Sequence, residues 1–546
     1  MRARRIFIAL LICLSLAVIP ALSAPALAQG GETSISVFTA SQPAPFWLGY
    51  TGRTGDATFI FGAIHCALLT QDSDFNLRPD LAERWELSED GRSYTFYLNP
   101  NARWHDGTPV TAADVEFSWV VFATPQARTE NRTRPPVFQA VLGGAAVAES
   151  AAQESVTGYA DTVKYEGIEI IDDHTIRFTL TSPNPLWLLT IGDGSPNGMI
   201  IPKHIMEDVP WNDWPSHEMN TSAPVGCGSY RFVQAIEGQY VELEAFDDYH
   251  LGRPAIDRIY VKSWLTGQVA AAQLESGELD LVLGLSIDDA TRLGANPGIV
   301  ISSTLASAAY QLSINTDLIT DPRVRLAMVY ALDREGINEA VFNGLGRVQE
   351  CCLFQSWAIP PDQEVRPYDP DRARELLREA GWDSNQVLDI LYPVGFRYAD
   401  VLMPIVQAQL AEVGIQTTLR PEESTAHRES LITRHDWYLW YNQSANMQPD
   451  PGSFTLWECR PAPTSGWRYC DDHMNDLWER GRSTVDPAER TAIYQEIQSI
   501  FYEQVPAVDI VVPPSVFGLS SRLQGFTPTA SMFRCSYNIY QWSVSQ

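Results

Sequence analysis

The segment from Asp436 to Asn442 carries the side chains best suited to binding a small molecule. Trp440 and Tyr441 offer flat apolar faces, and Asn442 supplies a donor and an acceptor of hydrogen bonds. Rings beside an amide suit a sugar ring or an extended, weakly charged ligand. The same aromatic residues could instead be core residues of a strand, and the sequence leaves both interpretations open.

Four further residues are candidates for ligand contact. Arg397 follows a strand-like run and precedes a helix, where it could pair bidentately with a ligand carboxylate or form a surface ion pair. Trp457 could face the same binding site. Phe46 and Trp47 follow the first strand-like run and could contribute from another part of the chain or pack internally.

The signals for catalysis or metal binding are weak. Asp72, Asp74 and Asn76 have the spacing of a calcium loop, but Leu77 stands where that loop needs glycine, so we expect an ordinary turn. Neither His-Glu-x-x-His nor Gly-x-Ser-x-Gly occurs in the sequence. We therefore expect no catalytic residue, no bound metal and no cofactor.

The first 28 residues have the features of a secretory signal peptide. Arg2, Arg4 and Arg5 form a basic region, an apolar run covers residues 6–22, and Ala26-Leu27-Ala28 supplies the small-x-small pattern of a cleavage site. We expect cleavage after Ala28 and a periplasmic location. The general secretory route fits the strong apolar run, although the arginine pair also resembles a twin-arginine signal.

The charge of the chain excludes several classes of partner. The formal net charge is −29, and removal of the signal peptide takes away three arginines and no acid, which leaves −32. Such a surface repels nucleic acid backbones and anionic lipid headgroups. A mature chain of about 518 residues is long enough for about three domains.

The cysteines predict disulfides, because an exported protein matures in an oxidising compartment. Cys459 and Cys470 enclose a short polar loop and are the pair that we expect to be bonded. The pairing of the other mature cysteines stays open; these are Cys66, Cys227, Cys351, Cys352 and Cys535.

Strand-like and helix-like segments alternate along the chain, which favours α/β lobes. The predicted strands lie at 33–41, 93–99, 168–180 around a turn at 172–174, 230–246 around a Glu237-Gly238 turn, 508–519 and 536–543. The predicted helices lie at 111–122, 322–342, 369–380, 398–413 and 487–504.

Several collinear motifs accompany these elements. They are Pro-Asp-Leu-Ala-Glu at 79–83, Trp-His-Asp-Gly-Thr-Pro-Val-Thr-Ala-Ala-Asp-Val at 104–115, Ile-Pro-Lys-His at 201–204, Pro-Val-Gly-Cys-Gly-Ser-Tyr at 224–230, Tyr-Asp-Pro at 368–370 and Val-Gly-Ile at 413–415. Together they resemble the family 5 extracellular solute-binding proteins of bacterial ABC importers, the oligopeptide-, dipeptide- and nickel-binding type. The resemblance covers nearly the whole mature chain in the family's order.

The resemblance implies a two-lobed α/β fold of the periplasmic-binding-protein type II, with an extra subdomain in the larger lobe. Lobe I would comprise residues 29–307 plus 516–546, with the subdomain at about 80–215, and lobe II residues 308–515. The chain would cross between the lobes near 310–312 and 511–513. A monomer would capture a peptide, sugar, opine or metal complex and deliver it to the transmembrane subunits of an ABC permease.

One departure from the family pattern bears on the ligand. Peptide-binding members carry an Asp three residues before an Asp-Pro step, and this Asp holds the free amine of the ligand. Here Asp450-Pro451 matches the step, but Met447 occupies the amine-binding position. The resemblance therefore does not predict capture of a free α-amine, and Asp450 is the nearest candidate for a replacement acid.

A secreted glycan hydrolase is the competing hypothesis from another functional class. Such an enzyme would need a pair of carboxylates across its cleft. The sequence offers an aromatic and amide segment at the expected cleft instead, so we favour a receptor.

Overall fold

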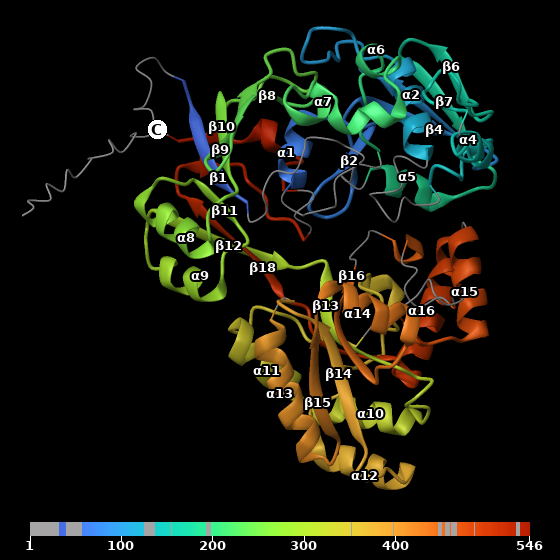
Figure 1. Cartoon of the computed structure of the whole chain (residues 1–546), viewed down its shortest axis with the longest axis vertical. Coiled ribbons are helices and arrows are strands. Elements are labelled where there is room, and N and C mark those ends of the chain that lie inside the picture. Colours follow the sequence, from blue (N-terminus) through green and yellow to red (C-terminus); the bar gives the residue numbers. More distant parts are fainter. Residues whose placement is uncertain are drawn as a thin grey trace, which may run out of the picture.

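The computed structural model describes residues 32–39, 57–124, 137–153, 155–192, 198–350, 352–396, 398–445, 450–453, 459, 467–484, 486–530 and 535–545. These residues form two large sheets, of seven and five strands, and smaller sheets of which the largest has four strands. Figure 1 shows the two large sheets in separate lobes, one above the other. Among the helices of these residues, none combines the length and apolarity needed to cross a membrane.

The first large sheet draws its strands from both ends of the chain. Its order is β12 (Ile299–Leu305), β18 (Pro514–Ser520), β11 (Leu281–Leu283), β1 (Ser34–Phe38), β10 (Arg258–Lys262), β9 (Tyr240–Ala245) and β8 (Tyr230–Ile236). Strand β1 runs parallel to both β10 and β11, and the other pairs are antiparallel.

Side chains alternate between the two faces of this sheet, as the period of a strand requires. Phe38 and Val282 pack with the helices α8 (Gly267–Ser276) and α9 (Ile287–Leu293) on one face. Val37 on the neighbouring position belongs to the larger core on the other face, together with α1 (Ala57–Ile64). Both faces are thereby covered with apolar side chains.

A smaller antiparallel sheet forms a subdomain of the first lobe. Its order is β4 (Ala82–Leu87), β5 (Ser93–Leu98), β7 (Thr175–Thr179) and β6 (Ile168–Asp172). Helix α2 (Ala112–Ala123) packs beside it, and the Asp114 carboxylate in its first turn accepts from the backbone N–H of Thr111 at 2.8 Å. This contact closes the start of the helix, as expected for a capping residue.

Short elements complete the first lobe. They are the hairpin strands β2 (Leu69–Gln71) and β3 (Leu77–Pro79), the helices α4 (Gly144–Ser150), α5 (Pro185–Ile191), α6 (Lys203–Met206), α7 (Glu218–Thr221) and η2 (Trp211–Ser216), and the C-terminal β19 (Leu523–Gln524), η7 (Ile539–Gln541) and β20 (Ser543–Val544).

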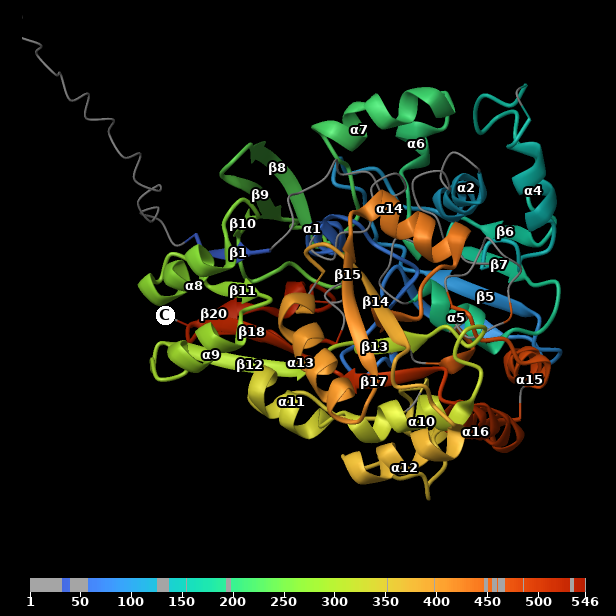
Figure 2. The ribbon, with the colours of Figure 1, turned by 60° about the horizontal axis from the view of Figure 1, so that its bottom comes forward.

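The second large sheet forms the core of the other lobe. Its order is β15 (Gln416–Glu422), β14 (Val387–Pro393), β16 (Leu439–Ala445), β13 (Ala308–Ile314) and β17 (Ala507–Val511). Helices α10 (Pro322–Ala331), α11 (Arg334–Phe342), α12 (Pro370–Ala380) and α13 (Ala399–Glu412) pack on it, as Figure 2 shows. The remaining elements of this lobe are η3 (Ser356–Ala358), α14 (Ser424–Glu429), η4 (Ser430–Arg434), η5 (Pro451–Ser453), α15 (Asp472–Ser483) and α16 (Pro487–Gln504).

Two neighbouring segments connect the large sheets. The chain passes from β12 to β13 at residues 306–307 and returns from β17 to β18 at residues 512–513. The segments lie side by side, because the backbone N–H of Ala306 donates to the carbonyl of Pro513 at 2.8 Å. The lobe boundaries expected at residues 307–308 and 515–516 stay predictions, and strand β18 begins at Pro514.

The predicted helices recur with one difference. Helix α16 has the predicted bounds, because Asp486 caps it and Pro487 occupies its first turn. The predicted helix at 322–342 is divided into α10 and α11: Leu332 leaves the helical conformation, and the Asp333 side chain accepts from the N–H of Gly336 to begin a new helix. An Asp inside an amphipathic run therefore acts here as a cap.

Two disulfides cross-link the described residues. Cys459 is bonded to Cys470, the pair that the sequence favours. Cys66, after α1, is bonded to Cys227, before β8, across 161 positions of sequence. Cys352 is buried, and its burial raises the pKa of the thiol well above its ordinary value. Cys351 lies outside the described residues.

Candidate functional site

Strand β16 carries the three central candidates, and its alternation separates them. Leu439 and Tyr441 point into the main core of the second lobe. Trp440 and Asn442 lie on the opposite face, opposite Ser313 and Gln311 of β13. The three candidates therefore do not form one continuous surface.

Tyr441 lies in the core. Its side chain is fully buried between Tyr310 and Phe396, whose ring centroids lie 5.9 and 5.5 Å from its own. Burial, with the neighbouring tyrosines, raises the pKa of its phenol above the ordinary value. The ring is covered by protein on this side of the sheet, so the structure gives Tyr441 a packing role.

Trp440 lies in a small aromatic cluster. Trp437 and Trp467 pack edge-on against it at 6.1 and 4.9 Å between ring centroids, and Leu391 and Leu431 complete the cluster. The side chain is 7% exposed, so its broad faces are not available for stacking on a ligand in this conformation. Its indole N–H, however, has no hydrogen-bond partner among the described residues.

Asn442 leaves an acceptor without a partner on the same face. Its Nδ2 donates to Ser313 Oγ at 2.9 Å and to the carbonyl of Trp440 at 3.0 Å. Because a carbonyl oxygen can only accept, these bonds fix the orientation of the amide. They leave Oδ1, which is buried, without a partner among the described residues. The indole N–H of Trp440 and Oδ1 of Asn442 therefore lie buried on one face of β16 without partners among the described residues. Buried groups of this kind normally bond to a ligand or an ordered water.

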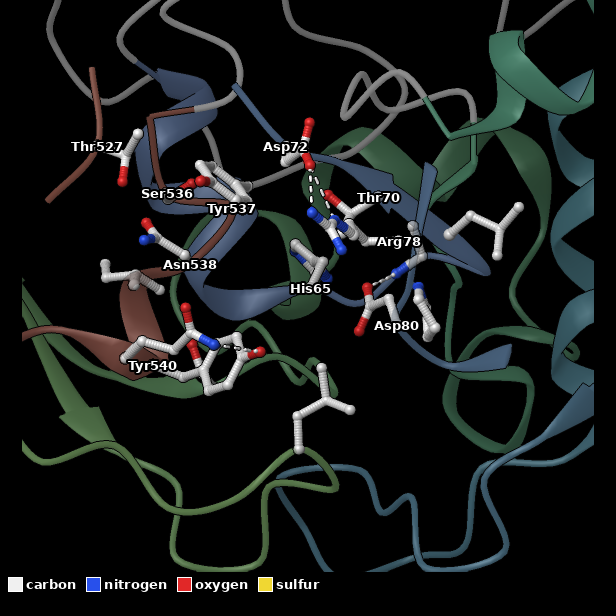
Figure 3. A pocket seen from close by; sticks show the side chains of 18 of the residues that line it. His65, Thr70, Asp72, Arg78, Asp80, Thr527, Ser536, Tyr537, Asn538 and Tyr540 are labelled. Carbon is white, nitrogen blue, oxygen red and sulfur yellow. Dashed lines mark hydrogen bonds and ion pairs between the residues drawn. The ribbon is translucent and has the colours of Figure 1, made fainter. Parts of the chain in front are cut away.

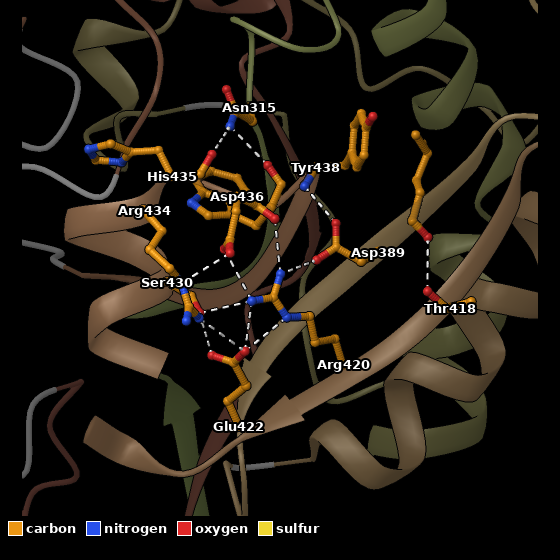
Figure 4. Close-up of polar contacts among 12 residues, drawn as sticks. Asn315, Asp389, Thr418, Arg420, Glu422, Ser430, Arg434, His435, Asp436 and Tyr438 are labelled. Carbon is orange, nitrogen blue, oxygen red and sulfur yellow. Dashed lines mark hydrogen bonds and ion pairs between the residues drawn. The ribbon is translucent and has the colours of Figure 1, made fainter. Parts of the chain in front are cut away.

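A network of ion pairs surrounds Arg420, beside the residues that precede strand β16 (Figure 4). Arg420 on β15 contacts the carboxylates of Asp389, Glu422 and Asp436 at 2.9, 2.7 and 3.1 Å. Asp389 also accepts from the N–H of Tyr438 at 2.8 Å. The network ties β14, β15 and the residues before β16 together, which fixes the position of Trp440.

Asp450 is committed to an internal ion pair. The guanidinium of Arg490, on α16, binds both of its carboxylate oxygens, one of them at 2.6 Å. Asp450 is 4% exposed, and the side chain of Arg490 is 12% exposed. A carboxylate engaged in this way is not available for a ligand amine in this conformation, and a ligand role for Asp450 stays a prediction from the sequence.

Phe46, Trp47, Arg397 and Trp457 lie outside the described residues, as does Met447. Their roles stay predictions from the sequence.

Sequence reasoning missed a cavity of about 710 Å³ in the first lobe. His65, Asp72 and Asp80 are among its lining residues, and none of the described candidate residues lines it. The spacing of Asp72, Asp74 and Asn76 marks a turn, as expected: Asp72 Oδ1 accepts from the N–H groups of Asp74 and Asn76. A histidine at the end of an apolar helix was the signal that could have indicated this cavity.

The comparisons with known proteins agree with this architecture. Residues 76–464 match the family described as bacterial extracellular solute-binding proteins, family 5 Middle. The dipeptide-binding protein of Escherichia coli is 27% identical over 457 residues, which covers 80% of this chain and 81% of that protein.

Two solved structures show the same fold. The ABC transporter substrate-binding protein CtaP of Listeria monocytogenes superposes with a TM-score of 0.78 at 24% identity, over 94% of this chain and 100% of that one. The binding protein AgaA of A. tumefaciens R10, in complex with agropinic acid, gives a TM-score of 0.70 at 23% identity, over 94% and 99%. The fold is therefore the two-lobed α/β fold of type II periplasmic binding proteins.

The family match covers well over half of the chain, and it includes strands of both large sheets. Proteins of this kind are the solute-binding components of ABC importers, which removes the hydrolase alternative. The chain belongs to the bacterial extracellular solute-binding proteins of family 5, and it is a binding protein rather than an enzyme.

Proposed function

We propose that this protein captures an extracytoplasmic solute of the peptide, oligosaccharide or opine class between its two lobes, without depending on a free α-amine. The solute would then be delivered to the transmembrane subunits of an ABC permease. The observation that carries the proposal is the pairing of Asp450 with Arg490, together with Met447 at the position where the family pattern leads us to expect an amine-binding acid.

The electrostatics support a ligand without a free ammonium group. An ammonium buried without a partner costs several kcal/mol, on the order of the desolvation penalty of an ion. Asp450 cannot offset that cost while Arg490 holds both of its oxygens. The dipeptide-binding protein and the agropinic acid complex show that relatives take different solutes on this fold, so the fold alone does not choose the ligand.

The second lobe offers polar edges rather than stacking faces. We infer that the indole N–H of Trp440 and Oδ1 of Asn442 serve the bound solute, directly or through water, because both are buried without partners among the described residues. Tyr441 would support them from the core side. Arg397, Trp457, Phe46 and Trp47 remain proposed contacts on sequence grounds.

Closure on the ligand would be a shift of population. Two adjacent connecting segments allow the lobes to move about one axis, as in hinge-bending binding proteins. Moving the equilibrium from mostly open to mostly closed takes about 5.5 kcal/mol of differential binding, which only a solute touching both lobes can supply. We further propose a periplasmic monomer whose signal peptide is cleaved after Ala28.

Calorimetry with matched ligands tests the proposal. The panel comprises di- to pentapeptides with free and with N-acetylated termini, and neutral oligosaccharides. Any peptide that binds should bind about equally well after acetylation, and Asn442→Ala should weaken binding of the preferred ligand by about 1–3 kcal/mol. Gln443→Ala, the neighbouring position on the same strand, is the control. Binding that acetylation abolishes would overturn the proposal.

A further inference from the structure

The cavity of about 710 Å³ lies within the first lobe, and Figure 3 shows its lining side chains. The described lining residues come from the end of α1, the β2–β3 hairpin, residues 199–251 and the C-terminal segment 527–541, and none belongs to the five-stranded sheet. Its volume falls within the range of roughly 300–1,000 Å³ that small-molecule sites occupy.

His65 is the buried polar side chain of this cavity. It is 4% exposed, it lines the cavity, and neither of its ring nitrogens has a hydrogen-bond partner among the described residues. Burial, with the nearby His105, lowers its pKa to about 3, so the imidazole is neutral at physiological pH. A neutral imidazole offers one donor and one acceptor, and both call for a partner.

The charges around the cavity disfavour an anion. Among the described lining residues, three are acidic, Asp72, Asp74 and Asp80, and one is an arginine, Arg78. Asp72 is bonded to Arg78 at 2.6 Å, and Asp80 accepts from the N–H of Ala67 at 2.8 Å. The remaining negative charge would repel a carboxylate or a phosphate.

The rest of the lining is aromatic and hydroxylated. Tyr249 and Tyr540 pack edge to face with 5.5 Å between ring centroids. Thr70 and Ser536 add hydroxyl groups from opposite ends of the chain, and Figure 3 shows both at the cavity with Tyr540. Aromatic edges and faces beside short hydroxyl side chains suit a ligand with both C–H and O–H surfaces.

These features distinguish between ligand classes. An ammonium group could donate to one nitrogen of His65 but could not accept from the other. A carboxylate could accept but would meet the acidic lining. A hydroxyl group both donates and accepts, and it can also donate to a carboxylate oxygen.

We propose that this cavity is a second solute site, for an uncharged polyhydroxylated molecule of the monosaccharide or polyol class, with His65 as its central polar contact. A solute bound there touches described residues of one lobe only. We expect its occupancy and that of the site between the lobes to be independent of each other.

The test follows the ring nitrogens of His65 by NMR on protein labelled with ¹⁵N-histidine, and His65→Phe assigns the signal. The probes are D-glucose, D-galactose, myo-inositol and glycerol, with sodium acetate and methylammonium chloride as charged comparisons. At least one hydroxylated probe should shift the His65 signals saturably, and the charged probes should not. His65→Phe should weaken that binding at least tenfold, as measured by calorimetry.

Controls separate this site from the one between the lobes. His473→Phe changes an exposed histidine on α15 and should leave the affinity unchanged. Thr70→Val keeps the shape of another lining side chain but removes its hydroxyl group, and it should also weaken binding. This variant tests the cavity if His65→Phe folds poorly. The solute that binds between the lobes should bind His65→Phe with unchanged affinity. This measurement tests the proposed function separately from the second site.

Three results would overturn the proposal. The first is that no hydroxylated probe shifts the His65 signals at millimolar concentration, which would mean that the cavity holds only water. The second is that a charged probe binds in preference. The third is that Asn442→Ala, and not His65→Phe, removes the binding of the hydroxylated probe, which would place that probe between the lobes.

Discussion

Replacing Asp450 by Asn separates a structural role from a ligand-binding role. In the folded protein the carboxylate receives two hydrogen bonds from Arg490, and both side chains are largely buried. Arg490 keeps one other strong bond, from its Nε to the carbonyl of Gly481 at 2.8 Å. The substitution removes the negative charge and leaves the guanidinium buried without a counter-charge.

The expected cost is large. Hydrogen bonds to charged groups contribute about 1.5–3 kcal/mol each, and breaking one partner of a buried ion pair costs about 3–5 kcal/mol. We expect Asp450→Asn to lower the free energy of unfolding by about 3–5 kcal/mol. The affinity for the ligand should change little, because Arg490 occupies both carboxylate oxygens.

Urea unfolding, followed by fluorescence and circular dichroism, gives the stability, and calorimetry on the folded variant gives the affinity. Glu169→Gln is the matched control, because Glu169 forms an exposed ion pair with Arg177 at 2.8 Å. An exposed pair of this kind is worth at most about 1 kcal/mol.

The opposite pattern would assign Asp450 to the ligand. If Asp450→Asn unfolded at the same urea concentration as the wild type and lost its affinity for a free-amine ligand, Asp450 would be an amine-binding residue. Arg490 would then have exchanged partners on ligand binding.

Three further predictions concern stability. Glu350 bridges the buried Arg334 and the partly buried Arg366, at 2.6 Å each. Glu350→Gln should therefore lower the free energy of unfolding by about 3–5 kcal/mol, and a loss below that of Glu169→Gln would contradict this. Replacing both Cys66 and Cys227 by Ala should lower the free energy of unfolding by about 5 kcal/mol in the chain-entropy model. The same change at Cys459 and Cys470 should lower it by about 3 kcal/mol. Urea midpoints in the reverse order would contradict the model. Burial lowers the pKa of His65 to about 3 and that of His105 to about 4, so the unfolded chain binds these protons first as the pH falls below about 6.5. The free energy of unfolding should therefore fall from about pH 6.5 toward pH 4, by up to about 1.4 kcal/mol per pH unit for each histidine. If His65→Phe left the slope of this free energy against pH unchanged, His65 would not contribute to it.

The elements of the fold were largely predictable because their signals are local. Asp486 and Pro487 mark the start of α16, and Gly238 takes a positive φ in the turn between β8 and β9. The division between α10 and α11 was missed because Asp333 lies within a continuous amphipathic run, where a cap and an exposed helical residue look alike.

The candidate site was predictable only in part. The alternation along β16 could have shown that Trp440 and Tyr441 face opposite sides, but not which side is open. The partner of Asp450 lies 40 positions away, and that of Cys66 161 positions away. Such pairs depend on how the elements pack, which the spacing of residues does not encode.

Native mass spectrometry of the protein purified from its source organism tests the central claim most directly. One solute molecule should be retained between the lobes of each chain, with an unchanged mass after prolonged incubation and with its release on unfolding. A bound molecule that is converted to smaller products during incubation would contradict the assignment as a solute-binding protein.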